Sequence, residues 1–154
     1  MKGVKIKLLL DTNIFIRIFV GDIEKQFKEC KRLLELIESI DYQIKIYVPQ
    51  IVVLEIGWVL GGKYYKFSRK EIVTALTSLK SKNITLVDKI DFAKGLNIFE
   101  KYKVKLGDAM IAASEAVQKK GAIIVSYDKD FDRIPGVKRL TPKEATKLVM
   151  SYGR

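Results

Sequence analysis

The sequence contains no histidine and a single cysteine, Cys30, and these two absences exclude several kinds of catalytic and metal site. Ser-His-Asp and Cys-His catalysis, histidine general bases and His or Cys zinc sites all need residues that this chain lacks. A disulfide within one chain is excluded as well. Any catalysis must use carboxylates, hydroxyls, lysines or a metal with oxygen ligands, and such ligands select hard cations such as magnesium or manganese. Cys30 lies in a helical pattern and is predicted to be a small core residue.

Long apolar segments are also missing. The longest stretch without a charged residue runs from Ile46 to Leu54, nine residues, whereas a helix that crosses a bilayer needs roughly 18. The only candidate signal core, Leu8 to Leu10, is interrupted by Asp11, and no small-residue cleavage site follows it. We therefore expect no transmembrane segment and a cytoplasmic protein.

Positive charge, by contrast, is in excess. The 29 Lys and Arg residues outnumber the 18 Asp and Glu residues and give a formal net charge of +11, which attracts polyanions over long distances. Nucleic acid is the leading class of partner, although lysines that only keep the surface soluble explain the charge equally well. The length of 154 residues and the absence of repeats or linkers predict one domain over residues 1–154, since domains usually contain about 100 to 200 residues.

Short apolar runs alternate with amphipathic periodicities along the chain. Strands are predicted at 6–10, 44–48, 84–87, 122–126 and 138–140. Helices are predicted at 24–39, 50–60, 68–80, 91–102, 107–119 and from 141 onwards. Two of them begin at Ser-x-x-Glu or Thr-x-x-Glu sequences, which have the spacing of capping boxes. The alternation predicts an α/β fold with a mainly parallel sheet covered by helices on both faces, in which ligands bind beyond the carboxyl ends of the strands.

Four acidic residues differ from the rest because each adjoins apolar sequence. Asp11 and Asp128 follow predicted strands, whereas Glu55 and Asp108 lie in the first or second turn of predicted helices. A carboxylate near a core is costly unless it is paired, hydrogen-bonded or bound to metal. Taken singly, each has an ordinary alternative, namely an Asx turn or helix cap for the three aspartates and a buried ion pair for Glu55.

The predicted topology brings these four acids to the same edge of the sheet. Four like charges cannot ionise in one pocket without raised pKa values or a cation, and a divalent metal resolves the conflict. In a basic protein this combination indicates metal-assisted attack of water on a phosphodiester, with one ion or with two about 4 Å apart.

At this point the sequence resembles the PIN-domain ribonucleases, and among them the toxins of VapBC-type toxin-antitoxin modules. Four motifs carry the resemblance, in the family's order and at compatible spacing: LLLDTN at 8–13, VLE at 53–55, GDAMIAA at 107–113 and SYDKDF at 126–131. The resemblance implies a three-layer α/β/α sandwich with a five-stranded parallel sheet, Mg²⁺ or Mn²⁺ as cofactor, and hydrolysis of single-stranded or structured RNA.

The resemblance also implies roles for individual residues. Asp11, Glu55, Asp108 and Asp128 would be the catalytic, metal-binding quartet, while Asn13 and Ser126 would orient it by hydrogen bonds; the family more often has threonine at position 126. Two further acids have two interpretations. Asp130 and Asp132 could share in metal binding, but the preferred interpretation is that they cap the turn that Phe131 anchors in the core.

The resemblance further implies a small antitoxin partner and a homodimer. Exposed-looking aromatics such as Tyr64 and Tyr65, in the basic segment 63–69, would suit a dimer contact, RNA or a solvated loop. The alternating lysines at 101, 103 and 105 are interpreted as a solvated edge. A non-catalytic PIN-like module that binds RNA or protein, and a housekeeping RNA-processing nuclease, remain alternatives. A haloacid-dehalogenase-type phosphatase would need a second aspartate where Asn13 stands.

Overall fold

The computed structural model describes residues 3, 6–40, 43–80, 83–87 and 89–152. Its centre is a five-stranded sheet with the order β3-β2-β1-β4-β5, and each pairing in it is parallel. The strands are β1 (Ile6–Leu10), β2 (Ile44–Pro49), β3 (Ile84–Val87), β4 (Ile123–Val125) and β5 (Arg139–Leu140). The predicted fold class, with a mainly parallel sheet of about five strands, is confirmed.

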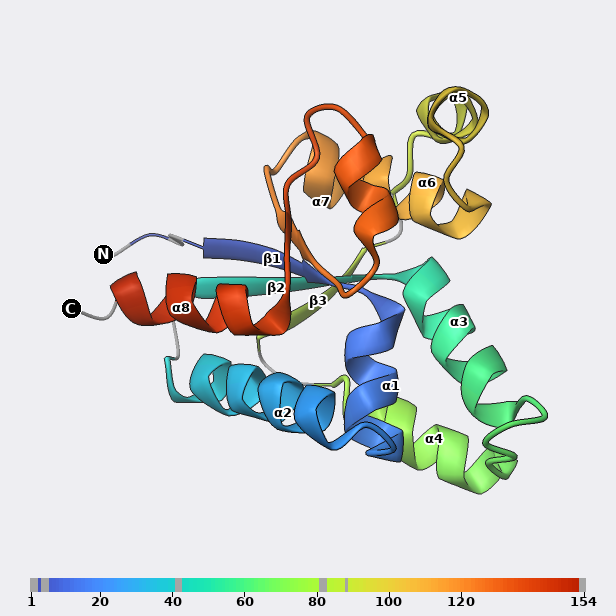
Figure 1. Cartoon of the computed structure of the whole chain (residues 1–154), viewed down its shortest axis with the longest axis vertical. Coiled ribbons are helices and arrows are strands. Elements are labelled where there is room, and N and C mark those ends of the chain that lie inside the picture. Colours follow the sequence, from blue (N-terminus) through green and yellow to red (C-terminus); the bar gives the residue numbers. More distant parts are fainter. Residues whose placement is uncertain (1–2, 4–5, 41–42, 81–82, 88, 153–154) are drawn as a thin grey trace.

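Helices cover both faces of the sheet and make the three layers that were expected (Figure 1). One layer contains α1 (Thr12–Val20), α2 (Glu24–Ser39) and α8 (Pro142–Tyr152). The other contains α5 (Phe92–Tyr102), α6 (Leu106–Ala112) and α7 (Glu115–Gln118). Between the layers, α3 (Gln50–Gly61) follows β2 directly and contacts α1, α6 and α4 (Arg69–Thr77). The carboxyl edge of the sheet is therefore surrounded by α1, α3 and α6.

The core lies on both sides of the sheet. The last three residues of β1 have no exposed surface, as is usual for a parallel strand covered on two faces. From α2, Cys30, Leu33 and Ile37 pack into the same core, so the core position predicted for Cys30 is confirmed. Within the part of the chain that is described, no helix has the length and apolar character to span a membrane.

Helix α1 was not predicted from the sequence. Its residues after Asn13 are mostly β-branched or aromatic, and such residues favour strands over helices. The Asp11 side chain caps the helix by accepting a hydrogen bond from the Thr12 N–H, and Gly21 ends it in a left-handed conformation with φ of 68°. Contacts with α2 and α3 stabilise it despite its weak intrinsic preference.

The single helix predicted over 107–119 is wrong, because the chain breaks after α6 and begins again as α7. Between the two helices Ser114 forms an antiparallel bridge with Ile90, and the Asp91 N–H donates to the Ala113 carbonyl at 3.0 Å. This backbone pairing replaces the helical hydrogen bonds. The sequence gives no sign of the break, since small apolar residues with good helix propensity continue across it.

Both predicted capping boxes form. The Ser68 hydroxyl accepts the Glu71 N–H while the Glu71 carboxylate accepts the Ser68 N–H, and the helix that follows ends at Thr77, three residues before the predicted end. Thr141 and Glu144 make the same reciprocal pair at the start of α8. These two helix starts could be predicted from the sequence because a capping box involves only residues that are close together in the chain.

Candidate active site

The four acidic residues singled out in the sequence come together at one cleft of about 320 Å³. Asp11 follows β1 as the N-cap of α1, and Asp128 follows β4 as the N-cap of a short 3₁₀ turn, Lys129–Arg133. Glu55 lies in the second turn of α3 and Asp108 in the first turn of α6. The cleft is therefore at the carboxyl edge of the sheet, where a parallel α/β fold is expected to bind its ligand.

Asp11 is the most enclosed of the four, with 4% of its surface exposed. Its carboxylate accepts hydrogen bonds from the Thr12 N–H at 2.7 Å, from the Ser126 hydroxyl at 2.6 Å and from the Asn13 amide at 3.3 Å. Burial raises its pKa to about 6, although the bonds from Ser126 and Thr12 lower it. Two negative neighbours, Glu55 and Asp128, add to the rise. Among the described residues, no lysine or arginine nitrogen lies within 4.0 Å of the Asp11 carboxylate.

Ser126 and Asn13 connect the ends of β1 and β4. The Ser126 hydroxyl donates to Asp11 and accepts from the Asn13 amide at 3.0 Å and from the Asp128 N–H at 2.9 Å. A hydroxyl has one donor and two acceptor positions, so this one is fully used. The Asn13 side-chain oxygen also accepts the Tyr127 N–H at 3.3 Å. These contacts hold the Asp11 and Asp128 side chains in fixed positions relative to each other.

Asp108 has a buried oxygen, Oδ2, that finds no hydrogen-bond partner among the described residues. Burial raises the pKa of Asp108 well above its ordinary value, and the charges of Asp11 and Asp128 raise it further. For Asp128, burial alone would raise the pKa, but the Asp130 N–H, the neighbouring Asp108 and the Lys105 ammonium together lower it. Of the two carboxyls, Asp108 is therefore the one that is more readily protonated.

Glu55 forms no ion pair with any residue that the structure describes, so that interpretation of it is wrong. The Thr12 hydroxyl donates a hydrogen bond to its Oε2, and its Oε1 lies against the backbone of Gly107. A Cβ at position 107 would overlap with Oε1, so a larger residue there would force the Glu55 carboxylate to shift. The sequence pointed to Glu55 but assigned no role to Thr12 or Gly107, because their contacts join segments far apart in the chain.

A fifth acid lies beside this group. One carboxylate oxygen from each of Asp108, Asp128 and Asp130 lies within 4.8 Å of the other two. The turn is capped by Asp128, whose carboxylate accepts the Asp130 N–H at 2.9 Å, so the preferred capping interpretation of Asp130 and Asp132 is wrong. Asp132 instead forms two hydrogen bonds of 2.9 Å with Arg139. Phe131 is fully buried, as expected.

These residues fit a divalent cation. The donors are all oxygens, as hard cations prefer. The group includes a buried carboxylate oxygen without a partner and a second carboxyl, Asp11, whose pKa is raised by burial. A bound cation would favour the ionised form of both and relieve their mutual repulsion.

Arg17 and Tyr65 also line the cleft, and of the two only Tyr65 was singled out in the sequence, as an exposed-looking aromatic. Arg17 of α1 donates to Asp22 at 2.6 Å, and the Tyr65 hydroxyl donates to the same carboxylate at 2.9 Å. Both Arg17 and Tyr65 line the cleft, whereas the neighbouring Tyr64 is 84% exposed. The basic segment 63–69 therefore contributes one aromatic side chain to the cleft and presents another to solvent.

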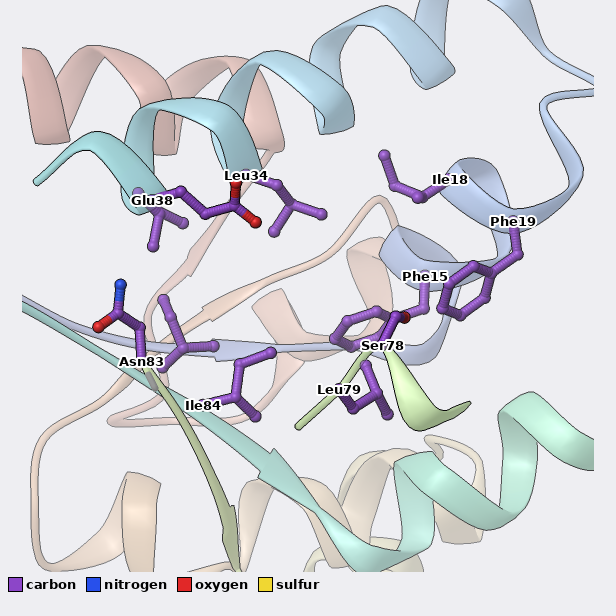
Figure 2. Close-up of a pocket in the computed structure, with 11 residues that line it drawn as sticks. Phe15, Ile18, Phe19, Leu34, Glu38, Ser78, Leu79, Asn83 and Ile84 are labelled. Atoms are coloured by element: carbon purple, nitrogen blue, oxygen red, sulfur yellow. The ribbon is translucent and has the colours of Figure 1, made fainter. Parts of the chain in front are cut away.

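A second cavity, of about 220 Å³, lies on the other side of α1 and differs in character. Figure 2 shows Phe15 and Phe19 of α1 facing Leu34 of α2, with Leu79 and Ile84 nearby. Its lining is mostly carbon, and it gathers no cluster of charges. The metal-binding chemistry predicted from the sequence points to the acidic cleft and not to this pocket.

A model of the PIN domain matches residues 8–137, which include all four acidic residues of the cleft. This chain belongs to the PIN-domain family. No curated protein sequence matches it significantly.

Several solved structures are similar to it. A toxin-antitoxin complex from Klebsiella pneumoniae contains a chain with 28% identity and a TM-score of 0.58; the match covers 89% of this chain and 98% of that one. VapBC-1 from nontypeable Haemophilus influenzae matches with 17% identity, a TM-score of 0.63 and the same coverage. VapBC2 from Rickettsia felis, bound to a DNA fragment from its promoter, matches with 16% identity and a TM-score of 0.58, covering 88% and 98% of the two chains. At 17% and 16% identity, the last two similarities are evidence for the fold alone.

Proposed function

We propose that this chain is a metal-dependent endoribonuclease, formed by one domain over 1–154, and that it is the toxin of a toxin-antitoxin pair. The observation that carries the proposal is the cleft in which a PIN-family chain gathers Asp11, Glu55, Asp108 and Asp128, one of them with a buried oxygen that lacks a partner. The toxin-antitoxin complexes among its structural neighbours support the biological role. The cytoplasmic location stays a prediction from the sequence.

Mg²⁺ or Mn²⁺ would be held by the four acids, with Asp130 close enough to assist. When bound, such an ion makes water a stronger nucleophile and stabilises the charge that develops on the phosphodiester. Asn13 and Ser126 hold Asp11 in place through hydrogen bonds, and Thr12 does the same for Glu55. Arg17 and Lys105 line the cleft as the cations nearest to an incoming phosphate.

RNA as the substrate is supported by the net charge of +11 and by a basic groove between α2 and α8. The cations that line this groove are Lys28, Arg32, Lys143 and Lys147. Glu29, on the groove's edge, accepts a hydrogen bond of 2.7 Å from the Tyr127 hydroxyl, and Tyr127 directly precedes Asp128. Phosphates held in the groove would therefore lie beside the segment that carries Asp128.

An antitoxin and a second copy of the chain are the proposed protein partners. An antitoxin arginine would suit the acidic cleft, because a guanidinium binds a carboxylate through two hydrogen bonds and would exclude metal. For the homodimer, the exposed apolar side chains of α3, with Leu54 at 72% and Trp58 at 83%, are better candidates than Tyr65, whose hydroxyl is bonded to Asp22. Light scattering tests the dimer, and a mass near 17.6 kDa at every concentration would reject it.

RNA cleavage by the purified chain, with Mg²⁺ or Mn²⁺ and then with excess chelator, tests the central proposal. Asp108→Asn should abolish cleavage, whereas Asp132→Asn should preserve it, because Asp132 is bound to Arg139 outside the cleft. Cleavage that survives chelation would contradict the metal requirement. RNA binding without cleavage would favour the non-catalytic module, and cleavage without toxicity in growing cells would favour the housekeeping nuclease.

A further inference from the structure

Lys105 occupies the mouth of the acidic cleft, although its alternation with Lys101 and Lys103 was interpreted as a solvated edge. It is the N-cap residue of α6, three positions before Asp108. Its ammonium nitrogen lies 3.5 Å from Oδ2 of Asp128, and the residue lines the cleft. The solvated-edge interpretation is therefore incomplete for this lysine.

The segment that carries Lys105 is fixed to the turn that carries the acids. Lys103 ends α5 in a left-handed conformation with φ of 55°. Its carbonyl accepts a hydrogen bond of 3.2 Å from Arg133, and the Arg133 guanidinium also lies 3.4 Å from the Asp130 carboxylate. Arg133 thus joins the approach to α6 to the turn of Asp128 and Asp130. This connection places the backbone of Lys105 next to the turn that carries Asp128, and the Lys105 ammonium reaches the Asp128 carboxylate from there.

Lys105 also offsets part of the negative charge of the four acids in the cleft. Within the described ranges, it is the only lysine or arginine with a nitrogen within 4.0 Å of a carboxylate oxygen of Asp11, Glu55, Asp108 or Asp128. Arg17 lines the same cleft, but its ion pair is with Asp22. In the absence of metal, one ammonium therefore provides the direct compensation for this group of acids.

We propose that Lys105 is a built-in counter-cation that competes with the divalent ion for the acidic cleft. Its ammonium neutralises Asp128 in the metal-free protein, and an ion that binds the acids must displace it. Lysine suits this role because its charge is compact and its stem is flexible. The side chain is 76% exposed, so the displaced ammonium can move into water without disturbing the core.

This inference rests on the proposed function only in requiring that the acids bind a divalent ion. It predicts that removal of the Lys105 charge tightens metal binding. Exposed charge pairs contribute up to about 1 kcal/mol, so the expected gain in Mn²⁺ affinity is about fivefold at low salt. The gain should shrink as salt increases, because added ions screen the repulsion between the ammonium and the metal.

The test is a calorimetric titration of Mn²⁺ into the full chain after chelator treatment and dialysis. The variants are Lys105→Gln, Lys105→Arg, which keeps the charge, and Lys103→Gln as the matched control. Lys103 is exposed and lies two residues away, so its replacement removes the same charge without touching Asp128. Lys105→Gln should bind Mn²⁺ about fivefold more tightly than the wild type, whereas Lys105→Arg should bind no more tightly and Lys103→Gln should match it.

A second readout does not depend on the binding isotherm. Without metal, Lys105→Gln should have a slightly lower melting temperature than Lys103→Gln, because it loses the ion pair with Asp128. Saturating Mn²⁺ should then raise the melting temperature of Lys105→Gln by more than it raises that of the wild type. The N-cap position makes no side-chain hydrogen bond, so the substitution leaves the start of α6 intact.

Three results would overturn the inference. Equal Mn²⁺ affinities for the wild type and Lys105→Gln would show that the ammonium does not compete, and weaker binding by Lys105→Gln would show that it assists the metal. Either result leaves the proposed nuclease function standing. Failure of both proteins to bind Mn²⁺ would reject the inference together with the metal requirement of the proposed function.

Discussion

Helix α1 separates two cavities of opposite character, and the contrast between them shows which one the chain uses for chemistry. Thr12, Asn13 and Arg17 line the acidic cleft, whereas Phe15 and Phe19 line the apolar pocket. The apolar pocket is lined mostly by hydrocarbon side chains. The acidic cleft gathers carboxylates whose charges conflict, including an oxygen of Asp108 without a partner. An unresolved electrostatic conflict at the edge of a sheet identifies a functional site better than the presence of a cavity does.

The two sides of α1 should therefore respond to substitution in opposite ways. Side chains of the apolar pocket contribute to the free energy of unfolding through burial and packing. Acids of the cleft oppose one another in the metal-free protein, so they serve binding and catalysis rather than stability. The predictions below test this division.

The largest expected effect is on the apolar side. Phe15 is 2% exposed, and Phe15→Ala should lower the free energy of unfolding by about 3 to 5 kcal/mol, since it removes a buried ring and leaves a cavity. Urea denaturation measures the change. Mn²⁺ affinity should stay within about twofold of the wild type in the molecules that remain folded, because Phe15 does not line the acidic cleft. Loss of metal binding in folded protein would contradict the division.

On the acidic side, Asp108→Asn should reduce RNA cleavage at least about a hundredfold, equivalent to about 2.7 kcal/mol of transition-state stabilisation. Its metal-free melting temperature should equal or exceed that of the wild type, because an amide cannot ionise in this buried, acidic surrounding, whereas the carboxyl ionises there at a cost. Single-turnover cleavage assays and thermal unfolding measure the two effects, with Asp132→Asn as the control. A variant destabilised by several kcal/mol would mean that Asp108 is structural.

The third effect is a dependence of stability on pH in the metal-free protein. Because burial raises the pKa of Asp11 from 3.8 to about 6, the folded protein holds this proton more tightly than the unfolded chain. Its contribution to stability is fully present below about pH 4 and is lost as the pH rises through about 6. The total change is about 3 kcal/mol, of which about 2 kcal/mol is lost between pH 4.5 and 7.

Other carboxyls act in the opposite direction, since the pKa values of Asp22 and Asp132 are lowered in the folded state. The effect of Asp11 is therefore measured as the difference in unfolding free energy between the wild type and Asp11→Asn at pH 4.5 and 7. The difference should favour the wild type more at pH 4.5. A difference independent of pH would contradict the raised pKa.

The smallest expected effect concerns the groove between α2 and α8. The double substitution Lys143→Gln with Lys147→Gln should weaken binding of single-stranded RNA to catalytically inactive Asp108→Asn by about tenfold and reduce the slope of log K against log salt by about 1.4. A matched pair, Lys70→Gln with Lys94→Gln, removes two exposed lysines from α4 and α5. Equal effects of the two pairs would mean that only net charge matters.

The strands of the sheet, the four acids that adjoin apolar sequence and both capping boxes could be predicted from the sequence, because each depends on a local pattern of residues. An acid next to an apolar run, such as Glu55 or Asp108, is conspicuous without any structure. Features that depend on contacts between distant segments were not predictable. Helix α1 consists mostly of residues that favour strands. The break at Ser114 is made by pairing with Ile90, and the close approach of Gly107 to the Glu55 carboxylate depends on how α6 packs beside α3.

The strand order has a consequence for synthesis of the chain on the ribosome. β4 lies between β1 and β5, yet it is made after β2 and β3, so β1 keeps an open edge until residues 123–125 arrive. The Asn13–Ser126 hydrogen bond that joins the ends of β1 and β4 spans 113 positions. The nascent protein therefore cannot assemble its acidic cluster until Asp128 has been translated, which delays any nuclease activity until that segment has been made.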